Sequence, residues 1–169
     1  MGSRSDQTVS TGPSRPVGAS DFDFIHGSWR VRHRKLRDRL AGCRDWIEFG
    51  GTMHADPILG GLGNFDRNAI DLPEGSYQAC TLRLFHPDTA IWSLHWIDGR
   101  NPGIDSPLHG VFENGIGIFH GDDVFAGRPI RIRFRWDQQA PGRARWEQAF
   151  SADQGATWEV NWIMEFARS

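Results

Sequence analysis

Apolar and polar residues alternate along most of the chain beyond residue 27, and a period of two is typical of β-strands. The clearest case runs from Ile130 to Trp136, where four apolar residues alternate with three arginines. A helix would spread those arginines around its circumference, whereas a strand places all of them on one face. The same alternation predicts strands over residues 90–98, 144–150 and 158–166.

Weaker alternation predicts further strands over residues 28–35, 44–54, 60–68, 75–86 and 110–120. Turn-forming dipeptides such as Asn114-Gly115 and Pro141-Gly142 separate strands,. About nine strands at this spacing are typical of a sandwich or a barrel. Residues 36–42 also fit a short charged helix as an alternative to loop. The inward positions are mostly Trp and Phe, which favours a small antiparallel barrel around a cavity; the alternative is a solid aromatic core.

The first twenty residues differ in composition from the rest. Residues 1–20 contain no aromatic residue and are rich in Ser, Gly, Pro and Thr, so we expect a disordered tail,. The folded domain is expected to span residues 21–169. It opens with one short helical turn, for which Asp21 is the candidate N-cap and Gly27 the candidate stop.

Composition narrows the classes of function. The chain has 169 residues, with 19 basic and 21 acidic side chains and a formal charge of −2, which argues against nucleic-acid binding by bulk charge,. No apolar run is long enough for a membrane-spanning helix, so we expect no membrane partner. Residues 1–20 lack the apolar segment of a secretory signal, and we therefore expect a cytoplasmic protein,.

Several motifs carry a family resemblance. Gly27-Ser28-Trp29 resembles the GxW signature of lipocalin-type barrels, in which an Arg near the last strand's end, here Arg168, stacks on the Trp at the closed end. Residues 21–168 as a whole resemble a bacterial lipocalin-like (calycin-type) family of unknown function. The matching segments are Asp23 to Trp29, Gly63 to Asp66, Leu82 to Pro87 and Trp92 to Trp96. The resemblance implies an all-β fold, one antiparallel barrel of about eight to ten strands, and no assigned activity.

Motifs for cofactor or metal chemistry are sparse. The seven histidines form no HxH or HExxH cluster, and no GxSxG or phosphate-loop pattern occurs, so we expect neither metal nor cofactor,. Residues 151–158 fit the SxDxGxTW pattern of an Asp-box, which we interpret as a hairpin device,. A haem-binding barrel family shares the GxW opening but carries glycines where this chain has residues 30–33, so haem binding is a lesser alternative.

Polar residues placed among aromatic ones form the candidate site, because a polar group on an apolar wall needs a partner. We expect ligand contacts from Trp46, Glu48, Asn64, Arg83, Trp96, Trp136, Trp146, Gln148 and Trp162. Trp46 alternates with Ile47 and Phe49, so these two residues compete with it for the inward side of the strand. The favoured function is a barrel that binds a small hydrophobic or aromatic molecule, and a second copy of the chain, giving a homodimer, is a further candidate partner.

The alternative function is an enzyme of isomerase, cyclase or lyase type on the same barrel. There a desolvated Glu48 with a raised pKa would be the general base, and Arg83 would stabilise an anionic intermediate. In a purely structural interpretation, Glu48 and Arg83 instead form a buried pair with each other.

Overall fold

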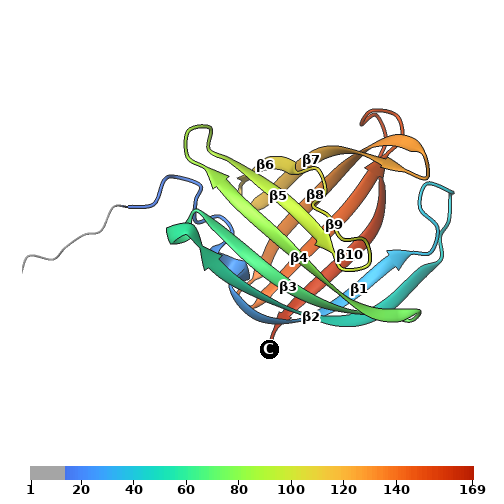
Figure 1. Cartoon of the computed structure of the whole chain (residues 1–169), viewed down its shortest axis with the longest axis horizontal. Coiled ribbons are helices and arrows are strands. Elements are labelled where there is room, and N and C mark those ends of the chain that lie inside the picture. The colour runs from blue at the N-terminus through green and yellow to red at the C-terminus, as the bar shows by residue number, and fades with distance from the viewer. Residues whose placement is uncertain (1–13) are drawn as a thin grey trace, which may run out of the picture.

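Ten antiparallel strands close into a barrel in the computed structural model, which describes residues 14–169 (Figure 1). The strands are β1 Gly27–Leu36, β2 Trp46–Ile58, β3 Gly63–Leu72, β4 Gly75–His86, β5 Ile91–Asp98, β6 Leu108–Glu113, β7 Ile116–Phe125, β8 Arg128–Ala140, β9 Arg143–Ser151 and β10 Glu159–Arg168. Two single 3₁₀ turns accompany them, η1 Asp23–Ile25 and η2 Leu59–Gly61. This confirms the predicted fold class.

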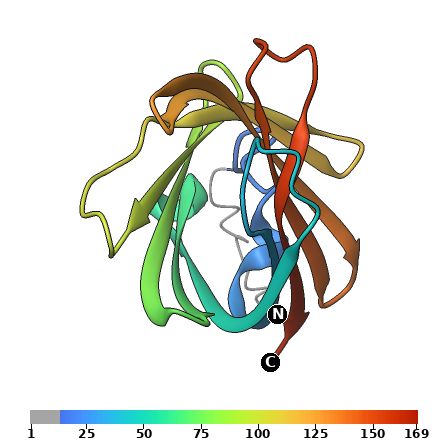
Figure 2. The same cartoon turned by 90° about the vertical axis from the view of Figure 1, so that its right-hand side faces the viewer.

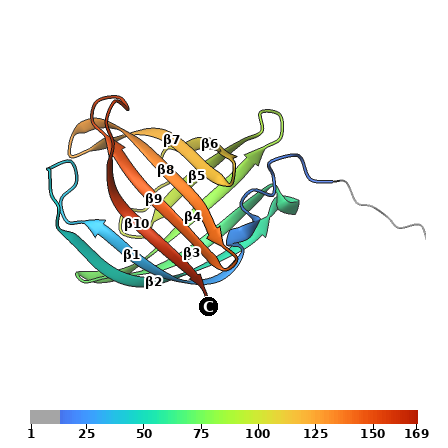
Figure 3. The ribbon, with the colours of Figure 1, turned by 180° about the vertical axis from the view of Figure 1, so that it is seen from behind.

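The connectivity is a simple meander. Each strand pairs with the next along the chain, and β1 also pairs with β10, which closes the ring (Figures 2 and 3). Closure gives every strand a hydrogen-bonding neighbour on both sides and so leaves no sheet edge exposed for pairing with another chain. Because side chains point alternately into and out of the barrel along every strand, every second residue of a strand has the same parity, that is, it faces the same side. The apolar parity of each strand forms the barrel core.

Two segments differ from the pattern predicted for them. Residues 110–120, predicted as one strand signal, form two strands, because the predicted turn at Asn114 and Gly115, both of positive φ (51° and 78°), separates β6 from β7. That pair of left-handed residues is what a tight hairpin requires. Residues 36–42 form no helix: β1 runs to Leu36, and the chain then continues as a loop to Trp46.

Trp29 and Arg168 meet at one end of the barrel, as predicted. The Arg168 guanidinium carbon lies 4.0 Å from the centre of the Trp29 ring, and the two residues are also backbone neighbours between β1 and β10. The Trp29 Nε1–H donates to the Ile25 carbonyl at 2.7 Å. Arg168 donates to the carbonyls of Phe24, at 2.9 Å, and His26. Arg168 thus ties the last strand to the turn that covers this end.

The η1 turn brings an aromatic plug to this end. Phe22 is buried and packs edge to face on Trp92 and Trp136, with ring centres 5.0 and 5.9 Å apart. Asp21 is not the cap that the sequence predicted, because η1 begins at Asp23 and the preceding Phe22 makes no side-chain cap bond. Burial of Phe22, rather than capping, therefore fixes the turn.

The packed chain begins within the segment expected to be a tail. Ala19 is buried, and the Gly18 carbonyl accepts a hydrogen bond from the Trp92 indole at 3.1 Å. Residues 1–13 of that expected tail lie outside the described residues. The boundary placed at residue 20 therefore falls inside the packed segment.

The Asp-box is a hairpin between β9 and β10. The Asp153 carboxylate accepts from the backbone N–H and the hydroxyl of Thr157, at 2.9 and 2.6 Å, and the Ser151 hydroxyl accepts from the Gly155 N–H at 2.7 Å. The two bonds from Thr157, together with one that the Ser151 hydroxyl donates at 2.7 Å, lower the Asp153 pKa to about 2. The structural interpretation of the motif is consistent with this geometry.

Within residues 14–169, every helical segment is too short to cross a bilayer.

Candidate functional site

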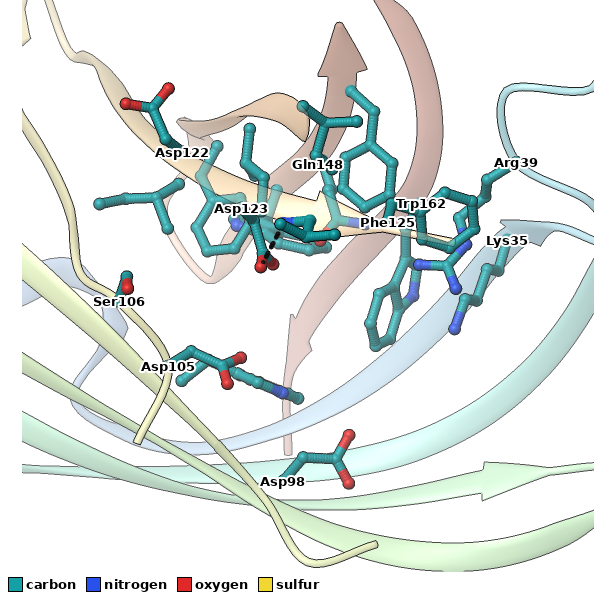
Figure 4. A pocket seen from close by; sticks show the side chains of 18 of the residues that line it. Lys35, Arg39, Asp98, Asp105, Ser106, Asp122, Asp123, Phe125, Gln148 and Trp162 are labelled. Carbon is teal, nitrogen blue, oxygen red and sulfur yellow. Dashed lines mark hydrogen bonds between the residues drawn. The ribbon is translucent and has the colours of Figure 1, made fainter. Parts of the chain in front are cut away.

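A cavity of about 200 Å³ lies at the end of the barrel opposite Trp29, beside the C-terminal half of β1 (Figure 4). Its apolar wall comes from the inward faces of β5, β6, β8, β9 and β10, and consists of Trp96, Leu108, Ile130, Ile132, Phe134, Trp146, Phe150 and Trp162. One water molecule occupies about 30 Å³ in the liquid, so this space is far larger than a water-sized void. The barrel interior is therefore not filled solid by its tryptophans.

The indoles of the wall pack on one another edge to face. The Trp162 ring centre lies 5.6 Å from that of Trp146 and 6.2 Å from that of Trp96, with interplanar angles of 84° and 81°. Phe134 meets Trp146 at 4.8 Å. Edge-to-face contacts of this kind fix ring orientation. The wall is therefore a preformed aromatic surface carried by hydrogen-bonded strands.

Two inward polar residues support this wall. The Gln148 amide donates to Asn161 Oδ1 at 2.8 Å, and the Trp162 Nε1–H lies 3.2 Å from His33 Nδ1. Burial lowers the His33 pKa to about 4, so this ring is neutral at pH 7 and its Nδ1 can accept the indole proton,. Asn161 Nδ2 is buried and has no partner among the described residues.

Charged residues form the rim of the cavity and, apart from the Asp98–Arg100 ion pair, the two signs lie on different sides (Figure 4). Lys35 and Arg39 lie together beside Trp162, whereas Asp105, Asp122 and Asp123 lie across the opening. The acidic side comes from the β5–β6 loop and β7, and the basic side from β1 and the loop after it. The rim thus has a basic side adjacent to the aromatic wall.

Lys35 is the rim cation carried by β1. It lies on the same parity of β1 as Trp29, Val31 and His33, and its ammonium nitrogen is 4.5 Å from the centre of the Trp162 ring. Burial, helped by the positive charges of Arg39 and Arg100, lowers the Lys35 pKa to about 8.

Four predicted ligand contacts line this cavity: Trp96, Trp146, Gln148 and Trp162. Three more face the interior but lie deeper, toward the closed end: Asn64, Arg83 and Trp136. Trp46 and Glu48 lie on the outer face of β2. The interior of the barrel is thus divided into the cavity at the open end and a packed base, which includes Asn64, Arg83 and Trp136, toward the closed end.

Glu48 is not a buried carboxylate. It faces Arg34 across the β1–β2 ladder on the outer surface and forms ion pairs with Arg32 at 2.9 Å and Arg34 at 3.5 Å. Hydrogen bonding to Arg32 lowers its pKa, the reverse of what a general base of raised pKa needs. Ile47 and Phe49 take the inward parity of β2 instead, which also places Trp46 outside, where the Arg34 guanidinium lies over its ring.

Arg83 has a buried partner, which is Asp66 and not Glu48. Arg83 Nη2 lies 2.7 Å from Asp66 Oδ2, and both side chains are almost fully buried. Asn64 accepts from Arg83 Nη1 at 2.9 Å, and the guanidinium carbon lies 5.2 and 5.3 Å from the ring centres of Phe22 and Trp136. Arg83 therefore holds the closed end together.

Sequence reasoning missed Lys35, Arg39 and the rim aspartates. The alternation of Trp29, Val31 and His33 could have placed Lys35 inside, since all four share one parity of β1. Arg39 and Asp105 lie on loops, where no periodicity indicates which side chains turn inward.

A second polar arrangement lies on the outer surface. The Ser28 hydroxyl lies 2.7 Å from His54 Nδ1, and His54 Nε2 lies 3.1 Å from Asp56, which also pairs with Arg67 at 2.9 Å. This serine–histidine–aspartate chain could activate a hydroxyl, but it borders a shallow outer hollow rather than the aromatic cavity. Among residues 14–169, no group of three or more His, Cys, Asp or Glu side chains is placed to hold a metal ion.

Together these features define a barrel of lipocalin-like fold, with ten antiparallel strands, a Trp–Arg contact at the closed end and an aromatic cavity at the other. Among solved structures it is similar to the S-type phycobiliprotein lyase CPES from Guillardia theta, with a TM-score of 0.56 and 10% sequence identity. That match covers 88% of this chain and 90% of the other, and at this identity it is a likeness of fold,. No protein-family model and no curated protein sequence matches the chain.

Proposed function

We propose that this protein binds a small, mostly apolar molecule with an aromatic ring in the cavity at the open end of the barrel. The observation that carries the proposal is a cavity of about 200 Å³ walled by Trp96, Trp146 and Trp162. An apolar protein cavity of about 150 Å³ holds benzene, so this one has room for one or two fused rings. The wall is aromatic and aliphatic, and the charged groups gather at the rim, so an apolar body can be buried while polar groups orient it,.

The rigidity of the wall favours a ligand-binding surface over side chains that only fill the core. Its indoles are held edge to face, and the Trp162 Nε1–H is bound to His33. A wall that is already ordered loses little side-chain entropy when a ligand arrives. The cavity is therefore preorganised for a flat molecule.

A second candidate function, a lyase with a protein partner, is suggested only by the name of the phycobiliprotein lyase that shares this fold. That likeness speaks for the barrel alone, because unrelated activities share one fold. Glu48, the carboxylate on which an isomerase, cyclase or lyase reaction was based, is on the outer surface, so binding is our conclusion. Haem ligation gains no support, since within the described chain no histidine lines the cavity.

Titration with 1-aminonaphthalene, a neutral aromatic probe of two fused rings, tests the proposal. We expect quenching of tryptophan fluorescence, energy transfer to the probe and a rise in Tm with probe concentration. Leu108→Trp, which fills the cavity from β6, should abolish binding, whereas Trp46→Phe on the outer surface should leave it unchanged. Equal binding to wild type and a folded Leu108→Trp variant would rule out this cavity as the site.

A further inference from the structure

The basic side of the rim holds two cations that have no carboxylate partner. Lys35 is the only lysine of the chain, and its ammonium lies against Trp162. The Arg39 guanidinium lies over Phe125 and Phe150, 4.5 and 5.4 Å from the ring centres. Within residues 14–169, neither side chain has an acidic oxygen within 4.0 Å.

These two cations carry an electrostatic cost. Both are partly buried, and burial together with the charge of Arg100 lowers the pKa of Lys35 and the pKa of Arg39. Aromatic faces return only part of the lost hydration, since a cation over a ring is held more weakly than one paired with a carboxylate. Partly buried charges in proteins are otherwise paired. The site therefore lacks a negative charge at this position.

The carboxylates nearest to this side are engaged elsewhere or exposed. Asp98 accepts from Arg100 at 2.7 and 3.0 Å. Glu159 accepts from the Leu40 backbone N–H at 2.8 Å, and Glu74 is exposed.

The acidic side of the rim does not supply the missing charge either. Asp122 faces Arg131 at 3.5 Å, Asp123 accepts from its neighbour's backbone N–H at 2.7 Å, and Asp105 lies across the opening from Lys35 (Figure 4). Lys35 and Arg39 can therefore be neutralised at this rim by the negative group of a ligand.

We propose that the ligand is an amphipathic anion, of the class of aromatic carboxylates, whose head group binds between Lys35 and Arg39 while its ring lies against Trp162. This rests on the proposed function and adds the charge of the ligand and the position of that charge. A carboxylate would accept charge-assisted hydrogen bonds from both cations, which are stronger than neutral ones. Neither the acidic side of the rim nor the packed base offers an equivalent site for an anion.

A pH dependence follows. Lys35 faces Arg39, Arg100, Asp98 and Glu74, and its pKa of about 8 in the free protein means that it loses its proton as the pH rises through that value. A bound anion stabilises the ammonium, so binding above about pH 8 requires proton uptake. The affinity for an anion should therefore fall on the alkaline side.

A matched pair of probes, 2-naphthoate and 2-naphthalenemethanol, tests the inference by calorimetric titration at pH 7. We expect the carboxylate to bind about tenfold more tightly than the alcohol. Lys35→Met and Arg39→Met should each remove most of that advantage, measured as the ratio of the two affinities within the same variant. Arg44→Met, which removes an exposed charge from the same loop, should change neither affinity.

Lys35→Arg separates a charge requirement from a general effect on folding. It keeps a cation that does not titrate below pH 12, so it should retain the preference for 2-naphthoate and lose the decline in affinity between pH 7 and about 9.5. Equal affinity for the acid and the alcohol, or a preference that survives Lys35→Met and Arg39→Met together, would overturn the anion assignment alone. If neither probe binds, the proposed function falls with it.

Discussion

Arg83 and Asp66 form an ion pair with a nitrogen–oxygen distance of 2.7 Å in the interior of the barrel, between the cavity and the closed end. Asp66 also accepts from the Thr81 N–H at 2.8 Å and the Asn68 amide at 2.6 Å. Hydrogen bonds on both partners offset the cost of burying two charges. The pair thus fixes β3 against β4 beneath the cavity.

Breaking this pair on one side should be costly. Asp66→Asn leaves Arg83 buried without a counter-charge, so we expect the free energy of unfolding to fall by about 3–5 kcal/mol in urea titrations. Glu48→Gln, which breaks ion pairs on the outer surface, is the control and should leave the urea midpoint unchanged,. A similar midpoint for wild type and Asp66→Asn would mean that the pair contributes little.

Arg168→Met should loosen the closed end. It removes the cation over Trp29 and the donors to the carbonyls of Phe24 and His26, so we expect a loss of about 1–2 kcal/mol in the free energy of unfolding,. Arg168→Lys keeps the charge but not the two-pronged donor and should lie between the two. Thermal unfolding measures both, and an Arg168→Met variant as stable as wild type would contradict the tie.

Deleting residues 1–20 should destabilise the barrel, in contrast to what the composition of that segment predicts. The deletion removes buried Ala19 and the Gly18 carbonyl that accepts from Trp92. A loss of about 1 kcal/mol would lower Tm by roughly 3–4 °C in a chain of this length. Deleting residues 1–13 is the matched control, for which we expect no change. An identical Tm for both truncations would show that Gly18 and Ala19 contribute nothing.

His33 should make stability depend on pH. Its folded pKa of about 4 lies below the ordinary value of 6.5, so the unfolded chain binds the proton more readily. The stability that the neutral ring provides is present above pH 6.5 and is lost as the pH falls toward 4, by roughly 3 kcal/mol at most.

The comparison of wild type with His33→Gln isolates this contribution. Burial also lowers the pKa of His26, His95 and His120, but these residues are common to both proteins. Urea midpoints from pH 7.5 to 4 should decline more steeply for wild type, and parallel curves would contradict the assignment.

Gln148→Leu tests the support of the cavity wall. The substitution roughly keeps the volume but leaves Asn161 Oδ1 buried without its donor, so we expect a loss of about 1–3 kcal/mol in the free energy of unfolding,. Gln78→Leu on the exposed face of β4 provides the control. If both variants unfold at the wild-type urea concentration, the Gln148–Asn161 bond has no structural weight.

The period-two pattern was sufficient to predict the barrel, because side-chain direction in a strand depends only on position. The parities of Trp146, Gln148 and Trp162 were predicted inward and they line the cavity. The contact between Trp29 and Arg168 followed from the GxW resemblance and is confirmed. At residues 46–49 both faces of the strand are apolar, with Trp46 on one and Ile47 and Phe49 on the other, so the sequence did not decide which face points inward. The candidate site therefore included Glu48, a carboxylate that faces water.

The partner of Arg83 and the charge of the rim were decided by tertiary structure alone. The β3–β4 register places Asn64 opposite Arg83, and Asp66 is the next residue of β3 on the same face, so it lies next to Arg83. Register is a property of the paired strands rather than of either sequence. Lys35 and Arg39 lie beside Trp162 because ring closure between β1 and β10 brings the two ends of the chain together. The sequence by itself determined the alternation of apolar and polar residues along each strand, and with it the strands of the barrel. The closed sheet decided which charges meet at the cavity, since residues 127 positions apart become neighbours only when the barrel closes.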